Sequence, residues 1–299
     1  MPETLDSPYG TGFVDLHAHT NESDGSLTPA ELVALAKNSD LAALAVTDHD
    51  TFSGYEKALP QAKAAGLPLV RGIELNTRLY LNGGRSHRSV HLLAYFLHGE
   101  PSHQFTDWLN EEREHRRLRN RLLAEALQAR GMHVTVEEAE ARGRVLTGRP
   151  HFARVLIEKG YAASFEDAFR RFLGEDAPTY VQRKSKTTDE VIAIVRHAGG
   201  IPVIAHPVRL GLQRDAERDL LLRFKQAGLV GLEIYHSEHT PELQAHYRQL
   251  AAELDLLPTG GSDFHGNIKP GVRLGTGADG NVRVPASFLD RMWAFTNHG

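Results

Sequence analysis

The sequence contains no cysteine among its 299 residues, which excludes disulfide bonds, thiolate metal sites and thiol nucleophiles. Histidine is abundant instead, with 17 residues. Because imidazoles and carboxylates bind divalent metals without thiolates, this composition directs attention to metal chemistry based on histidine, aspartate and glutamate. The absence of cysteine also fits a cytoplasmic enzyme, and we expect that location.

Long apolar runs and a large charge imbalance are absent too. No stretch of 18 apolar residues occurs, so the sequence predicts no transmembrane helix and no membrane partner. The segment before Phe13 is polar and lacks the apolar core of a signal peptide. The net charge of −4 gives no general attraction for nucleic acid, so local cations or metal ions must hold an anionic substrate.

One pattern recurs along the chain: an apolar segment of strand length ends in potential metal ligands. The segment that begins at Phe13 ends in His17 and His19, and side chains two residues apart share one face of a strand. The next apolar segments end near His49 and at Glu74. Parallel sheets and barrels place their chemistry at the carboxyl ends of their strands, so we expect these side chains to meet.

The alternation of strand and helix stops after Glu74. The turn sequence Asn82-Gly83-Gly84-Arg85 lies between the apolar segments Leu75–Leu81 and Val90–Phe96, which predicts a hairpin without a helix. An antiparallel return of the chain would bring His91 close to Glu74.

Helical patterns dominate the middle of the chain. We therefore divide it into a first barrel part at residues 1–98, a helical insertion domain at 99–188, and a second barrel part with the C-terminal segment at 189–299. The longest predicted helix, Asp107–Arg130, has Leu118 and Leu122 on its apolar face. Its arginines alternate with glutamates, which indicates a solvated surface more than an RNA-binding surface.

Coincidence explains one or two clusters of potential ligands at strand ends but explains six poorly. Each cluster taken alone has a simpler interpretation, such as a turn residue for Asp24, a capped strand end for His206 or a cap for Asp263. Together they predict a metal site assembled from several strands. The candidate ligands are His17, His19, Asp24, His49, Glu74, His91, His206, Asp263 and His265.

Neutral imidazoles combined with a few carboxylates favour Mn²⁺, Fe²⁺ or Zn²⁺ over Ca²⁺ or Mg²⁺. This number of ligands suits two or three ions. A site with several metals generates hydroxide near neutral pH, and it clamps the attacking and leaving oxygens of a phosphoryl displacement.

At this point the chain resembles the PHP (polymerase and histidinol phosphatase) family of metallophosphoesterases. The resemblance implies an α/β fold, a distorted (βα)₇ TIM-like barrel with a mainly helical insertion, and up to three metals. The motifs that carry it occur in the family's order: Asp15-Leu16-His17-Ala18-His19, Thr47-Asp48-His49-Asp50, Gly72-Ile73-Glu74, Val90-His91, Ala205-His206-Pro207 and Gly261-Ser262-Asp263-Phe264-His265.

The resemblance also implies how the ligands divide among three sites. The first set is His17, His19, Glu74 and Asp263, the second is Glu74, His91 and His206, and the third is Asp24, His49 and His265. Many relatives have histidine where this chain has Asp24. The aspartate form is similar to a subgroup with a helical insertion that acts on nucleotide 3′,5′-bisphosphates and on the 5′ ends of short RNAs.

That subgroup has an Arg-Thr-His-Phe-Ala-Arg motif in the insertion, and here the sequence runs from Arg149 to Arg154 with Pro150 in place of threonine. Arg149 and His151 are candidates to bind a substrate phosphate, because a guanidinium group matches phosphate geometry. Arg149 could also be an ordinary surface residue beside a helix start. Further candidate substrate-binding residues are Arg154, Lys184 and Arg209.

We therefore predict a metal-dependent phosphoesterase that uses a metal-bound hydroxide. The expected substrate is a nucleoside 3′,5′-bisphosphate, cleaved to the 5′-monophosphate, or a short 5′-phosphorylated RNA, and no obligate protein partner is evident. Alternatives are a histidinol-phosphate-type phosphatase, an amidohydrolase, an RNA-binding protein, or a degenerate barrel that serves as a binding module. The complete ligand set argues against degeneration.

Overall fold

The structure is a computed structural model that describes residues 9, 11–81, 86–142, 147–182 and 185–297. Most of the N-terminal segment, the predicted turn at 82–85 and Lys184 lie outside the described residues. Within the described ranges, no helix is both long enough and apolar enough to cross a membrane.

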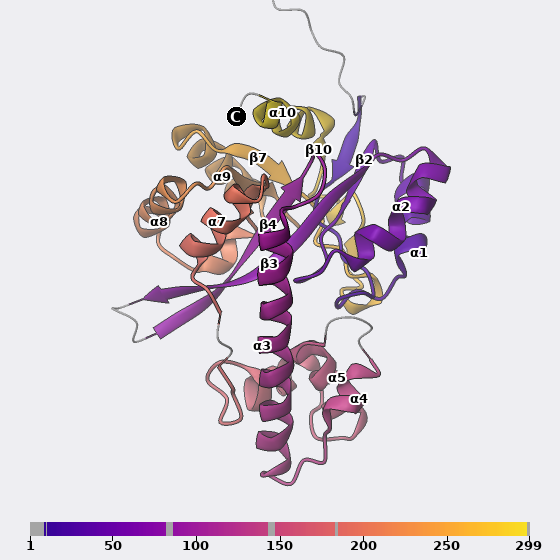
Figure 1. Cartoon of the computed structure of the whole chain (residues 1–299), viewed down its shortest axis with the longest axis vertical. Helices are drawn as coiled ribbons and strands as arrows, with labels where there is room; N and C mark the ends of the chain where they lie inside the picture. The colour runs from indigo at the N-terminus through magenta and orange to yellow at the C-terminus, as the bar shows by residue number, and fades with distance from the viewer. Residues whose placement is uncertain (1–8, 10, 82–85, 143–146, 183–184, 298–299) are drawn as a thin grey trace, which may run out of the picture.

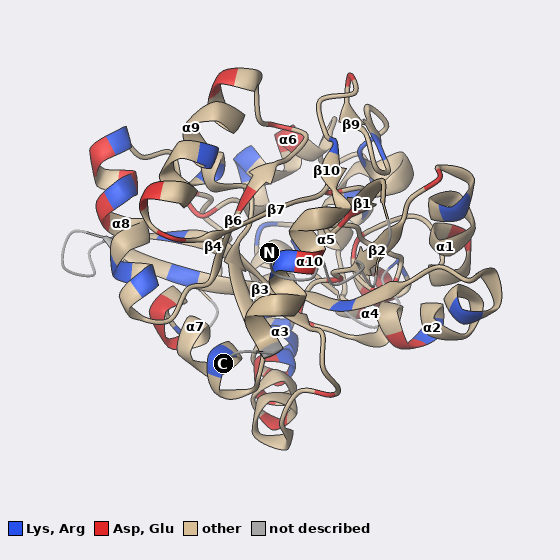
Figure 2. Cartoon of the chain, turned by 90° about the horizontal axis from the view of Figure 1, so that it is seen from above, with Lys and Arg blue, Asp and Glu red and all other residues tan. Residues whose placement is uncertain are grey.

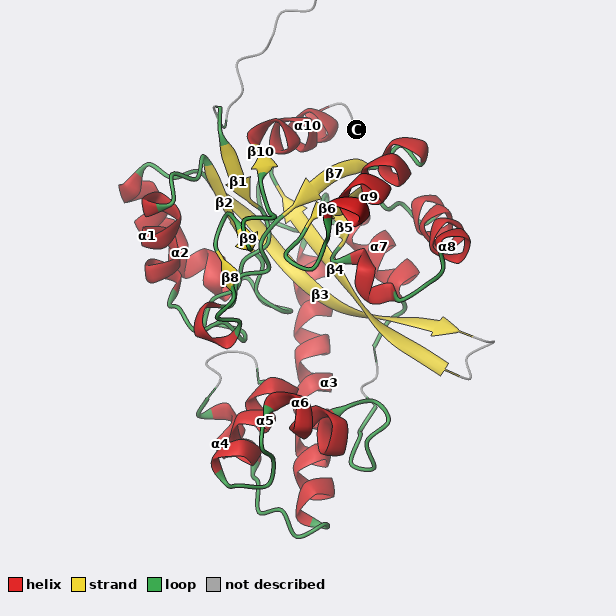
Figure 3. Cartoon of the chain, turned by 180° about the vertical axis from the view of Figure 1, so that it is seen from behind, coloured by secondary structure: helices red, strands yellow, loops and turns green. Residues whose placement is uncertain are grey.

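One eight-stranded sheet forms the centre of the molecule (Figure 3). Its order is β10-β1-β2-β3-β4-β5-β6-β7, and parallel pairs are interrupted where β10 meets β1 and where β4 meets β3 and β5. The strands are β1 (Phe13–Asp15), β2 (Ala43–Val46), β3 (Leu69–Leu81), β4 (Ser86–Phe96), β5 (Ile201–Ile204), β6 (Gly231–Tyr235), β7 (Leu257–Gly260) and β10 (Val284–Pro285). A separate small ribbon pairs β8 (Val272–Arg273) with β9 (Gly277–Ala278).

The sheet curls until β7 meets the segment that follows β1. The amide of Leu16 donates to the carbonyl of Gly260 at 3.2 Å, and the amide of Asp263 donates to the carbonyl of His17 at 2.8 Å. These bonds nearly close the sheet into a barrel at the carboxyl ends of the strands. The α/β class and the distorted TIM-like barrel are thereby confirmed, with β10 as an additional antiparallel strand.

The hairpin predicted after Glu74 is confirmed as well. Strands β3 and β4 are the two longest and run antiparallel across the molecule (Figures 1 and 3). Their register pairs Asn76 with His91 and Glu74 with Leu93. Glu74 and His91 consequently lie on adjacent strands within contact distance of each other.

Helices surround the barrel (Figure 1). The first begins at a capping box in which Thr28 and Glu31 satisfy each other's backbone amides. The barrel helices are α1 (Pro29–Asn38), α2 (Ser53–Ala65), α7 (Thr188–His197), α8 (Arg214–Gln226), α9 (Pro241–Glu253) and α10 (Ala286–Asn297). The charged residues on these outer helices are of mixed sign, as on α8 (Figure 2).

The insertion is built on one long helix that leaves the barrel, with shorter helices around its far end (Figure 1). These elements share a hydrophobic cluster of their own, which includes Leu127 and Phe152. They are α3 (His103–Gln128), α4 (Val136–Glu140), α5 (Arg149–Glu158), α6 (Phe165–Ala168) and a π-helical turn (Phe169–Leu173). The division of the chain into two barrel parts and an insertion domain, with boundaries at 98/99 and 188/189, stays a prediction.

The predicted orientation of the long helix was wrong. Leu118 and Leu122 are 49% and 41% exposed, whereas the buried positions of α3 include Arg116, Arg119 and Leu123. The apolar pattern misleads here because one helix spans several environments, and its first turns pack into the barrel core. The far end packs against the insertion core, while the central turns face a polar cavity where arginines are the buried residues.

This corrected orientation predicts opposite outcomes for two neighbouring leucines. Leu123→Ala should lower the free energy of unfolding by about 2–5 kcal/mol, because it opens a cavity in the insertion core. Leu122→Ala should change it by less than about 0.5 kcal/mol. Urea unfolding followed by circular dichroism measures both, and a larger loss in the Leu122 variant would contradict the assigned face.

Candidate metal centre

The structure brings all nine predicted ligands together at one end of the barrel. His17 and His19 follow β1, His49 follows β2, and Glu74 and His91 lie on the hairpin strands. The remaining ligands lie in loops: Asp24 before α1, His206 after β5, and Asp263 and His265 after β7. Side chains from β3, β4 and the segments after β1, β2, β5 and β7 therefore converge on one place.

The candidate ligands form three groups, and within each group the ligand atoms lie within 4.8 Å of one another. One group is identical to the first set implied by the family resemblance. The third implied set gains His19, and His49 joins Glu74 and His91 in the second. His206 lies beside that group, with its Nε2 3.0 Å from Glu74 Oε1 and 3.2 Å from His91 Nδ1. The groups are His17, His19, Glu74 and Asp263; His19, Asp24, His49 and His265; and His49, Glu74 and His91.

Glu74 lies between these groups and is only 1% exposed. Its Oε1 is 2.8 Å from His91 Nδ1, and His206 lies on the same side. Its Oε2 lies 3.3 Å from His17 Nε2 and 3.1 Å from His19 Nε2. Each carboxylate oxygen thus faces a different set of imidazoles, which is the arrangement that a carboxylate shared by two ions requires.

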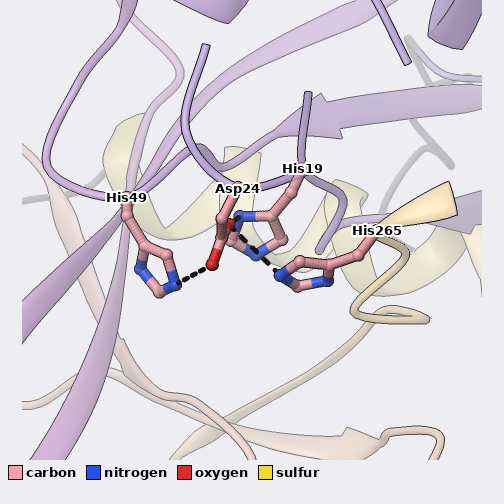
Figure 4. Close-up of side chains that lie close together, drawn as sticks. All are labelled: His19, Asp24, His49 and His265. Atoms are coloured by element: carbon pink, nitrogen blue, oxygen red, sulfur yellow. Dashed lines mark ion pairs between the residues drawn. The ribbon is translucent and has the colours of Figure 1, made fainter. Parts of the chain in front are cut away.

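Asp24 lies between the imidazoles of His49 and His265, in the group that also contains His19 (Figure 4). Its Oδ1 is 3.3 Å from His265 Nε2, and its Oδ2 is 3.6 Å from His49 Nε2. The ring of His19 is stacked on that of His265, with centroids 4.2 Å apart. The aspartate therefore occupies a position facing the same point as three histidines.

The carboxylates of the centre stay ionised. Burial opposes their charge, but the histidines around Asp24 and Glu74 outweigh burial and hold the pKa values of both well below normal. Burial also lowers the pKa of His49 to about 4, so that ring is neutral. His19 differs: burial disfavours its charged form, yet Asp263 and Glu74 raise its pKa to about 9. A proton there takes the place of a cation, and metal binding would release it.

The donor atoms themselves fit a cation. Among the described residues, no hydrogen-bond partner of good geometry reaches Nε2 of His17 or either ring nitrogen of His19, although all three atoms are buried. Buried polar atoms in proteins are normally satisfied. Unsatisfied imidazole nitrogens that point at ionised carboxylates indicate a position for divalent metal ions.

Glu233, which the sequence analysis did not select, bonds two residues of the ligand cluster, His17 and His206. Glu233 Oε1 is 2.9 Å from His17 Nδ1, and its Oε2 accepts a hydrogen bond from the His206 amide at 2.6 Å. Such a partner fixes the ring so that Nε2 faces the metal. A signal for this role was available in the sequence, since Glu233 is a single glutamate inside the apolar strand Gly231–Tyr235. An unpaired charge is costly to bury, so a glutamate at such a position indicates a partner.

Asp263 has partners that the sequence did not reveal. Its Oδ2 accepts hydrogen bonds from Lys269 Nζ at 2.6 Å, Arg209 Nη2 at 3.1 Å and His236 Nε2 at 3.3 Å. His236 Nδ1 accepts from the Glu238 amide, so the proton of that ring is on Nε2. With Oδ2 occupied by donors, Oδ1 is the oxygen that faces His17 and His19.

A cavity of about 440 Å³ connects the ligand cluster with the insertion. Of the predicted substrate-binding residues, Arg149, His151 and Arg209 line it, whereas Arg154 is only partly buried on α5 and does not. The insertion and β3 add arginines that the sequence analysis did not select. The cations and imidazoles of the insertion side are Arg78, Arg116, Arg119, Arg149 and His151.

His151 lines the cavity in a defined tautomer. Its Nδ1 accepts a hydrogen bond from the Gly148 amide at 3.0 Å, and burial lowers its pKa, so the ring is neutral with its proton on Nε2. Arg149 Nη1 donates to the carbonyl of Leu173 at 3.0 Å, which fixes the guanidinium group at the cavity wall. Arg116 forms an ion pair with Asp50, the residue after His49, and so connects the insertion to the metal-ligand loop.

Known proteins resemble this chain in sequence and in fold. The 5′-3′ exoribonuclease Rnm of Escherichia coli is 32% identical over 256 residues, with 84% of each chain covered. The 3′,5′-nucleoside bisphosphate phosphatase of Chromobacterium violaceum is 31% identical, covering 84% of this chain and 87% of the relative. A Bifidobacterium adolescentis structure, provisionally described as a metal-dependent phosphoesterase, is 32% identical with a TM-score of 0.78 and covers 94% of this chain and 95% of its own.

The PHP domain model matches residues 15–172, more than half of the chain. The match includes the ligands from His17 to His91, while His206, Asp263 and His265 come from later strands of the same barrel. Sequence, fold and the composition of the centre lead to one conclusion. This chain belongs to the PHP-domain family and is a metal-dependent phosphoesterase.

Proposed function

We propose that this phosphoesterase hydrolyses a nucleoside 3′,5′-bisphosphate to the 5′-monophosphate, with two or three Mn²⁺, Fe²⁺ or Zn²⁺ ions held by the nine clustered ligands. One observation carries the proposal: a single cavity joins the ligand cluster to a wall of arginines. A relative that is 31% identical to this chain is named as a 3′,5′-nucleoside bisphosphate phosphatase, which supports the proposal.

The ligand cluster would hold the reacting phosphate. Bound divalent ions polarise phosphoryl oxygens and lower the pKa of water, which supplies a nucleophile near neutral pH. The protein's own contribution is rigidity. Glu233 fixes His17, and the donors on Asp263 hold that carboxylate, so the ligands keep their positions as charge develops. Lys269 and Arg209 also line the cavity, where a phosphate can bind them.

The arginine wall would hold the second phosphate. Arg116 and Arg119 are 9% and 7% exposed, and Arg149 is fixed beside them on the cavity wall. Guanidinium groups bind phosphate through paired hydrogen bonds. A substrate with one phosphate, such as histidinol phosphate, would bind at the metal end and place no anionic group at this wall. The wall thus favours a bisphosphate.

A short 5′-phosphorylated RNA is the second candidate, favoured by the relative named as a 5′-3′ exoribonuclease. The cavity lies within the range of roughly 300–1,000 Å³ that small-molecule sites occupy. A terminal nucleotide would fit inside while the rest of the strand stays outside. Both candidates place one phosphate at the metal centre and another at the arginine wall.

We expect two or three divalent ions per chain in metal-loaded protein, measured by elemental analysis. Glu74→Gln should remove at least one ion and abolish turnover, because the amide cannot supply the charge that two groups of histidines share. Glu217→Gln is a matched control, since Glu217 is also buried but bonds His246, outside the cluster. Less than one ion per chain in the unaltered protein would refute the metal assignment.

Arg149→Ala should weaken kcat/KM for a nucleoside 3′,5′-bisphosphate by about 1.5–3 kcal/mol, the contribution of a charged hydrogen bond. Cleavage of p-nitrophenyl phosphate should change little, because that ester has no second phosphate. Arg154→Ala on the same helix is the control, since Arg154 does not line the cavity. Equal losses on both esters would show that Arg149 supports the fold or the reacting phosphate instead.

A further inference from the structure

The cavity has an aromatic end that neither metal binding nor phosphate binding uses. Phe165 and Phe169, from α6 and the π-helical turn, line it together with Pro150 and Ile268. Phe165 is 37% exposed, which places it among the most exposed large apolar side chains of the described residues. A large aromatic ring left open to a cavity costs free energy unless a ligand covers it.

The backbone beneath these rings is unusual. The amide of Gly174 donates to the carbonyl of Phe169 at 2.7 Å, five residues back, so the chain forms a π-helical turn directly after α6. Such turns are rare and occur often at functional sites. This turn presents Phe169 to the cavity, and the carbonyl of Leu173, at its end, holds the guanidinium of Arg149.

The aromatic end is adjacent to the arginine wall. The guanidinium carbon of Arg149 lies 5.8 Å from the ring centroid of Phe169. The cavity is therefore lined by metal ligands, cations and flat apolar rings. A ligand that satisfies all three must carry a reacting phosphate, a second anionic group and a flat ring system. A nucleotide with two phosphates has these parts.

We propose that Phe165 and Phe169 form a stacking platform for the nucleobase of the substrate. The inference rests on the proposed function and adds to it the group that distinguishes nucleotides from other bisphosphates. Stacking on an aromatic ring tolerates any base, because every base has a flat π-face. The platform would therefore select for the presence of a base more than for its identity.

The test compares adenosine 3′,5′-bisphosphate with the base-free 1-deoxyribose 3,5-bisphosphate. Phe165→Ala should lower kcat/KM for the nucleotide by roughly 5- to 150-fold, the range that base stacking supplies, and leave the base-free substrate nearly unchanged. Phe165→Trp should retain activity, and the tryptophan fluorescence it adds should be quenched by the nucleotide but not by the base-free compound. Phe295→Ala is the control, because Phe295 is 36% exposed but lies on α10 and does not line the cavity.

The outcomes separate this inference from the function on which it rests. If the unaltered protein cleaves neither compound, the bisphosphate assignment fails. If it cleaves both with the same kcat/KM, or if Phe165→Ala reduces both equally, bisphosphate hydrolysis stands and the stacking platform is refuted. Urea unfolding of Phe165→Ala shows whether a loss on both compounds comes from a damaged fold.

Discussion

The buried charge of Glu74 is the constraint on which the arrangement of the barrel depends. A carboxylate that is 1% exposed is stable only if cations or strong donors surround it. The barrel supplies these groups from several strands. Two of the residues around Glu74 adopt unfavourable backbone conformations there. His206 and Asp263 have φ angles of 28° and 55°, a region that side chains other than glycine rarely adopt. Strain of this kind persists where the surrounding structure fixes it.

The sequence allowed the barrel side of this centre to be predicted, because its signals are local. Apolar segments that end in His17, His49 and Glu74 identify strands, and parallel strands bring their carboxyl ends together by topology alone. The turn sequence before Val90 indicated the hairpin, and antiparallel pairing then brought His91 to Glu74 at 2.8 Å. These inferences needed no knowledge of side-chain packing.

The insertion side could not be predicted in the same way. Leu118 and Leu122 have the spacing of a core-facing stripe, yet the structure exposes them and buries Arg116 and Arg119. Periodicity tells which residues share a face but not what that face meets. Only the tertiary structure shows that the central turns of α3 border a cavity. His236 and Lys269 were missed for the same reason, since their role depends on contact with Asp263.

The two ends of the cavity carry opposite charges in the absence of bound metal. The barrel end is rich in ionised carboxylates, which attract divalent cations and repel a phosphate until those cations bind. The insertion end holds arginines, which attract phosphate. Arg116 joins the two halves, because it lines the cavity and pairs with Asp50 beside His49. The outer helices mix both signs of charge (Figure 2), so they present no one-sided attraction for a phosphorylated substrate. The substrate binding that we propose therefore depends on both a loaded metal centre and a correctly packed insertion.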